Sequence, residues 1–79
     1  MNPNMKKATR IRPGQFIAEV RKIYPRFGRA LLRYHTLKGH IVPVDYMPYG
    51  TKLMALYDVN DLGDFLKYLA IAQKYRAHS

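Results

Sequence analysis

The sequence predicts a mostly helical α+β domain in which two helices are followed by a β-hairpin and a third helix. Three observations support this prediction. Two segments with apolar residues at helical spacing are separated by a break at Pro25, and two β-rich runs flank a turn. A last segment with helical spacing follows Asp58, which resembles an N-cap. The chain has 79 residues, 48% of them hydrophobic, which is enough for one small core. We expect one domain over residues 14–79, preceded by a flexible basic arm over residues 1–13.

The arm combines two prolines with four basic side chains and has little periodicity, which is typical of an extended or disordered segment. Basic arms favour narrow, A·T-rich minor grooves, so these side chains are candidate DNA contacts. The alternative is a tail that only improves solubility. The four residues are Lys6, Lys7, Arg10 and Arg12.

The first helix is predicted to begin at Pro13, a residue suited to the first turn, and to end at Pro25. Its apolar positions recur with helical spacing and predict one buried face. They are Phe16, Ile17, Val20, Ile23 and Tyr24.

The second helix follows the short break Arg26-Phe27-Gly28 and extends to about Lys38, with Gly39 suited to its C-cap. Two helices joined by so short a turn favour a helix-turn-helix. Periodicity places Phe27, Ala30, Leu31, Tyr34 and Leu37 on the core face. The opposite, exposed face then carries Arg26, Arg29, Arg33 and Thr36.

The hairpin and the last helix complete the domain. The β-rich runs 40–46 and 52–57 flank a turn over residues 47–51, in which Pro48 precedes Gly50. Asp58 resembles an N-cap, and a helix over residues 59–76 follows it. The core face of this helix holds Leu62, Phe65, Leu66 and Leu69. A second apolar stripe, which indicates either a homodimer contact or ordinary surface scatter, holds Tyr68, Ile71 and Tyr75.

Charge is the strongest compositional signal, because 14 Lys and Arg residues face 5 Asp and Glu residues. The whole excess of +9 lies in residues 1–40, where ten basic residues accompany one acid, Glu19. Such asymmetry predicts a surface that binds a polyanion, since neutralising phosphates releases counterions. The alternative is a solvated basic face.

Several classes of function lack support in the sequence. There is no cysteine, and His35 and His40 have no further ligand to complete a metal shell. Asp58, Asp61 and Asp64 fit helix capping better than acid–base chemistry, and no nucleophile motif or phosphate loop is present. We expect no enzyme, no cofactor, no metal and no membrane span, and hence a cytoplasmic protein, which DNA binding would make nucleoid-associated.

Three fragments in order resemble the DNA-binding domain of the MerR family and of the related phage excisionases, over roughly residues 16–70. IAEVRKIY (17–24) is similar to the family's first helix, and LRYHTLKGHIVP (32–43) to its Leu-Arg-Tyr-Tyr stretch. YDVNDLGDFLKYL (57–69) is similar to the segment after the wing. The resemblance implies a winged helix-turn-helix. It also aligns Leu32 with the core, where periodicity places Leu31.

The resemblance implies that the second helix enters the major groove and that the hairpin is a wing. The candidate contacts are Arg26, Arg29, Arg33, Tyr34, His35 and Thr36 on the helix, and Tyr49, Thr51 and Lys52 on the wing. We expect a small sequence-specific transcriptional regulator, or an excisionase or DNA-bending protein, acting as a homodimer or a cooperative array. An RNA-binding protein and a protein inhibitor or adaptor are the rivals. The chain ends where longer MerR regulators continue into a sensing segment, so no small-molecule effector is expected.

Overall fold

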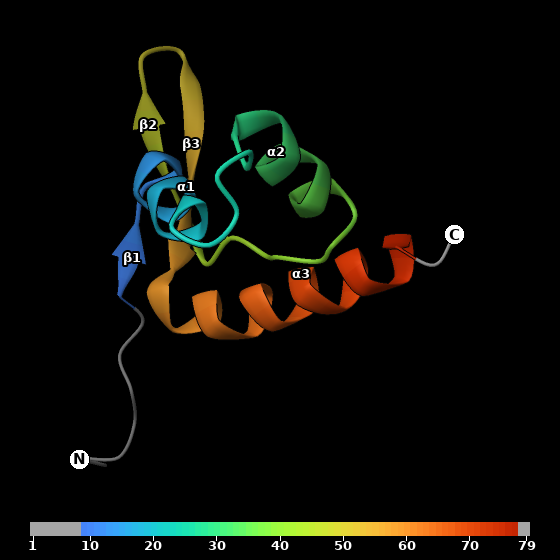
Figure 1. The fold of residues 1–79 in the computed structure, drawn as a ribbon. Helices are drawn as coiled ribbons and strands as arrows, with labels where there is room; N and C mark the ends of the chain where they lie inside the picture. The colour runs from blue at the N-terminus through green and yellow to red at the C-terminus, as the bar shows by residue number, and fades with distance from the viewer. Residues whose placement is uncertain (1–8, 78–79) are drawn as a thin grey trace, which may run out of the picture.

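The computed structural model describes residues 9–77, and the side chains up to residue 74. It is a small α+β fold of three α-helices and a three-stranded antiparallel sheet (Figure 1). The elements in order are β1 (Arg10–Ile11), α1 (Pro13–Arg21), α2 (Arg29–Leu37), β2 (Asp45–Tyr49), β3 (Lys52–Asp58), the 3-10 turn η1 (Val59–Asp61) and α3 (Leu62–Ala77). The predicted fold class, with its helix, helix, hairpin and helix, is therefore confirmed at this level.

The core lies where α1 crosses the sheet and α3 closes the remaining side. The Phe16 ring is fully buried, and its centroid lies 5.1 Å from that of Tyr57 on β3 and 5.5 Å from that of Phe65 on α3. The other members of this buried cluster are Ile17 and Val20 on α1, Phe27 and Ile41 in the segments before and after α2, Leu32 on α2 and Leu69 on α3. One aromatic residue from each of three elements thus fixes how they pack.

The hairpin of β2 and β3 turns more tightly than the sequence predicted. Residues 47–49 belong to β2 rather than to the turn, which consists of Gly50 and Thr51 alone. Gly50 has a φ of 62°, a left-handed conformation that is typical of the first central position of a two-residue hairpin turn. Pro48 is tolerated in the strand because β2 lies at the edge of the sheet.

The first helix ends four residues before Pro25, so its predicted boundary was wrong. The N–H groups of Ile23 and Tyr24 both donate to the Val20 carbonyl, which tightens the chain into a turn. The Arg21 Nε donates to the Pro25 carbonyl at 3.2 Å and holds that turn. As a result Ile23, expected in the core, is 59% exposed, and Phe27 takes the buried position instead.

The residues that α2 buries also differ from those that the apolar periodicity of the sequence predicts. Leu32 and His35 are its buried residues, whereas Leu31 is 38% exposed and Leu37 is 77% exposed. Phe27 is buried as expected, but it precedes the helix, and Gly28 between them is extended. Helical spacing counted from Phe27 therefore does not identify the residues that α2 buries. The alternative alignment, with Leu32 in the core, is the one that the structure has.

Part of the predicted flexible arm is ordered. Arg10 and Ile11 form β1, which pairs with Asp58 and Tyr57 at the end of β3. The Val59 N–H donates to the Thr9 carbonyl at 2.9 Å and extends this pairing. The arm prediction was therefore wrong for residues 9–13, and residues 1–8 lie outside the described part of the chain.

The last α-helix begins at Leu62, three residues later than predicted, because residues 59–61 form the 3-10 turn η1. Asp58 caps that turn, and its side chain accepts a hydrogen bond from the Asn60 N–H at 2.9 Å. Phe65 and Leu69 are buried and Leu62 and Leu66 pack against them, which confirms the predicted core face. None of the helices within residues 9–77 is long and apolar enough to cross a membrane.

The second apolar stripe predicted on α3, residues 68, 71 and 75, is not exposed as a whole. Tyr68 is partly buried, with its ring centroid 4.6 Å from that of His40. Ile71 is 57% exposed, and the side chain of Tyr75 lies outside the described residues. The expected dimer contact therefore keeps only Ile71 as a described, solvent-facing residue.

Candidate nucleic-acid interface

The exposed edge of α2 beside the hairpin carries two arginines. Arg29, Arg33 and Leu37 follow one another at intervals of four residues and lie along one side of the helix. This side borders a shallow groove between α2 and the sheet. The groove is lined by Pro13, Arg29, Leu32, Arg33, Thr36, Leu37, Ala55 and Tyr57. The α2 edge therefore presents positive charge next to an apolar surface.

The charge on this edge is not neutralised within the described part of the molecule. Among residues 9–74 the ion pairs are Arg10 with Asp45 at 3.1 Å and Lys22 with Glu19 at 2.9 Å. Neither pair involves the groove. Arg29 and Arg33 are exposed, and no acidic residue lies in the first turn of α2. Both guanidinium groups are thus available to an external anion.

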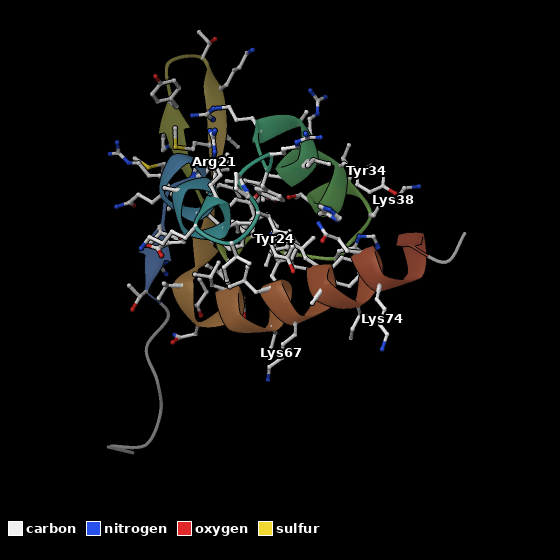
Figure 2. All side chains as sticks on the ribbon, viewed as in Figure 1. Arg21, Tyr24, Tyr34, Lys38, Lys67 and Lys74 are labelled. Carbon is white, nitrogen blue, oxygen red and sulfur yellow. The ribbon has the colours of Figure 1, made fainter. Side chains whose placement is uncertain are left out.

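The remaining predicted contacts of the second helix divide into two groups. Arg26 is exposed, but it lies in the turn before α2 rather than on the helix, which corrects its predicted position. Tyr34 is 46% exposed, not buried as periodicity predicted, and the Lys38 ammonium lies 5.9 Å from its ring centroid. Figure 2 shows Tyr34 and Lys38 together on the side of α2 away from the hairpin. They belong to a different part of the surface from Arg29 and Arg33.

His35 and Thr36 face inward. His35 is only 6% exposed, so it does not lie on the exposed surface of α2, where it was predicted as a candidate contact. The Thr36 hydroxyl donates to the Leu32 carbonyl at 2.7 Å and lies 2.8 Å from the Tyr57 hydroxyl. Thr36 thus ties α2 to β3 and lines the floor of the groove.

Sequence reasoning did not anticipate the polar cluster at the end of α2. The Nδ1 atoms of His35 and His40 lie 3.0 Å apart, and the Tyr68 hydroxyl lies 2.9 Å from the His40 Nδ1. These contacts link α2 to α3, which explains how a buried histidine is accommodated. The five-residue spacing across Gly39 was the available signal. No group of three or more His, Cys, Asp or Glu side chains suited to a metal occurs among the described residues.

The predicted wing residues lie at the tip of the hairpin. Tyr49, Thr51 and Lys52 are all exposed, and Tyr49 and Lys52 form the last pair before the turn. In Figure 1 the hairpin extends beyond the rest of the molecule. The groove lined by Arg29 and Arg33 reaches the hairpin at Ala55 on β3, so the arginines and the base of the hairpin border the same groove.

Of the predicted arm residues, Arg12 directly precedes Pro13, which lines the groove, whereas Arg10 lies on β1. Arg10 pairs with Asp45 on the sheet. Arg12 is exposed at the start of α1, where its N–H donates to the Gln15 Oε1 at 3.3 Å. Lys6 and Lys7 lie outside the described residues.

Asp61 provides a prediction on stability. Burial, and then the charges of Asp58 and Asp64, raise the pKa of Asp61 above its usual value of 3.8. A raised pKa means that the folded state holds this proton more tightly than the unfolded state. Ionised Asp61 therefore destabilises the fold, fully above its folded pKa and progressively less as the pH falls toward 3.8.

We expect Asp61→Asn to raise the free energy of unfolding slightly at pH 7 and to lose that advantage below about pH 4. Urea unfolding of both proteins from pH 3 to 7 measures the difference. Asp64→Asn is the matched control. We expect no net gain from it, because it relieves part of the repulsion on Asp61 but removes a carboxylate from the first turn of α3, where the helix dipole favours one. A difference that does not depend on pH would contradict the prediction.

The chain was also compared with known proteins. No protein-family model and no curated protein matches the sequence, and no solved structure matches the fold.

Proposed function

We propose that this chain is a winged helix-turn-helix protein that binds double-stranded DNA in a sequence-specific manner. In this proposal α2 enters the major groove and the β2–β3 hairpin is the wing. The observation that supports it most is the pair Arg29 and Arg33, one turn apart on an exposed helix edge and without a carboxylate partner among the described residues.

The dimensions and chemistry of α2 suit a major groove. An α-helix with its side chains is about 10–12 Å across, and the major groove is roughly 12 Å wide, so α2 can enter it side-on. An exposed arginine can bind guanine through two parallel hydrogen bonds. Gly28 contributes no side-chain acceptor to the first N–H groups of α2, so these groups are open to a phosphate oxygen.

The order of elements and the distribution of charge support the same proposal. Of the described basic residues, eight lie between residues 9 and 40 with Glu19 as the only acid there. This region contains α1, the turn and α2, which are the elements that contact DNA in a helix-turn-helix. Together with the resemblance to MerR-type domains, this leads us to propose a small transcriptional regulator. The exposed Leu53 and Tyr49 near the hairpin tip favour a second role, DNA bending.

The test is a selection of duplexes from a random pool with the full chain, at two salt concentrations. We expect one enriched motif, with affinity falling as salt rises by a slope of about −0.9 per neutralised phosphate. Structured RNA is the competitor. An inverted repeat would indicate a two-fold dimer. Binding without any motif, or preferential binding of the RNA, would contradict the proposal.

A further inference from the structure

The hairpin tip is apolar where a phosphate-binding wing would be basic. Pro48 pairs with Leu53 on the sheet face that also carries Ala55 and Tyr57, and Tyr49 pairs with Lys52 on the other face. Leu53 is 70% exposed and Tyr49 is 67% exposed. Lys52 is the one cation in the hairpin. Phosphate binding explains Lys52 but leaves the apolar side chains without a role.

The packing of the fold does not need these side chains either. On the inner face of β3, Tyr57 is buried against Phe16 and Ala55 packs against the edge of the core. Leu53 is the next residue on that face, but it lies only one pair from the turn and is exposed. The hairpin tip projects beyond α1 in Figure 1. Scattered exposed apolar residues are common, but here a cross-strand pair at a projecting tip is exposed together.

The outer edge of β2 is closed to a peptide that would add a strand. Across a two-residue turn Tyr49 and Lys52 form the hydrogen-bonded pair, so the backbone nitrogens of Pro48 and Tyr46 point away from β3. Pro48 has no N–H to donate. The Tyr46 N–H already donates to the Asp45 Oδ1 at 2.8 Å. A peptide added at this edge would find carbonyl acceptors but neither of these two N–H donors, which disfavours protein recognition by strand addition.

We propose that the hairpin tip is an apolar wedge that enters the minor groove beside the segment bound by α2 and bends the duplex. Leu53, backed by Pro48, inserts at a base step and partly unstacks it, while Lys52 contacts a flanking phosphate. Apolar side chains of this kind kink DNA when they enter a minor groove, and the arginine edge of α2 supplies the charge that holds the duplex beside the tip. The rigid ring of Pro48 and the two-residue turn make the tip narrow and stiff. The inference rests on the proposed function.

The wedge predicts which sequences bend. Pyrimidine–purine steps unstack most easily, so we expect a TA or CA step in the selected site, outside the bases that α2 contacts. A stiff step at that position, such as AA, should weaken binding although no side chain reads its bases.

The experiment measures bending and unstacking separately from binding. The full chain is bound to its selected duplex, with fluorophores at the two ends for energy transfer and 2-aminopurine at the predicted step. We expect a bend of about 20–90° and a several-fold rise in 2-aminopurine fluorescence. Leu53→Ser should remove at least half of the bend and most of the fluorescence rise, and Leu53→Met should restore both.

The control replaces an exposed apolar residue away from the hairpin. Val42 is 64% exposed in the connection between α2 and β2, and Val42→Ser should leave bend and fluorescence unchanged. A bound but straight duplex, or a bend that survives Leu53→Ser, would overturn the wedge and leave DNA binding intact. Loss of self-association on Leu53→Ser, with bending unchanged, would assign the tip to a protein contact instead. Absence of any duplex binding would overturn both proposals.

Discussion

Replacing Arg29 and Arg33 together with alanine is expected to lower the affinity for the selected duplex by at least about 30-fold, because one arginine–guanine pair contributes roughly 1–3 kcal/mol. Both side chains are exposed on the groove side of α2 and have no ion-pair partner among the described residues. Their removal should leave the free energy of unfolding nearly unchanged. Fluorescence anisotropy with the selected and a random duplex measures the change.

The matched control removes two positive charges elsewhere. Lys67 and Lys74 lie on α3 and point away from the rest of the molecule (Figure 2). We expect the Lys67→Ala/Lys74→Ala protein to bind the selected duplex within about threefold of the original, because these charges lie away from the proposed contact. Equal losses in the two double mutants would mean that net charge, and not the α2 edge, determines binding. A loss of affinity that is the same for random and selected duplexes would assign the arginines to phosphates alone.

Leu32→Ala is expected to lower the free energy of unfolding by about 2–5 kcal/mol, as large-to-small substitutions in a core do. Leu32 is only 3% exposed and belongs to the central cluster, where it connects α2 to α1 and the sheet. In a chain of this size the loss is a large share of the total stability. Thermal and urea unfolding, followed by circular dichroism, measure it.

Leu31→Ala is the control, since it removes the same atoms from the next position of the same helix. Leu31 is 38% exposed, so we expect its replacement to cost about 1 kcal/mol or less. The pair of variants distinguishes the two registers of α2 directly. A larger cost at Leu31 than at Leu32 would mean that the helix packs as periodicity alone predicts.

Elements with strong local signals were predictable. The core face of α3 follows from Phe65 and Leu69 at helical spacing behind the Asp58 cap. The positive φ of Gly39, 79°, fits the predicted C-cap after α2. These features depend on residues a few positions apart, so the sequence carries them directly. The pairing of β1 with β3 had no such signal, because it joins Arg10 to Asp58 across most of the chain.

The candidate site was predictable in part. The identity of Arg29 and Arg33 and their place on one helix edge came from the sequence, as did the place of Tyr49 and Lys52 in the hairpin. The inward positions of His35 and Thr36 did not. Periodicity favours burial of Tyr34 over His35, whereas packing allows a polar residue inside once hydrogen bonds satisfy it.

By itself, the sequence determined the order of helices and hairpin, the basic first half of the chain and the residue types that the surface offers. Only the tertiary structure decided the phase of α2, the length of the turn before it and the exposure of Leu53 beyond the core. The reason is that a helix carries several apolar residues around its circumference, here Leu31, Leu32 and Leu37. Contact with Phe16, Tyr57 and Phe65, which come from other elements, selects the residue that is buried.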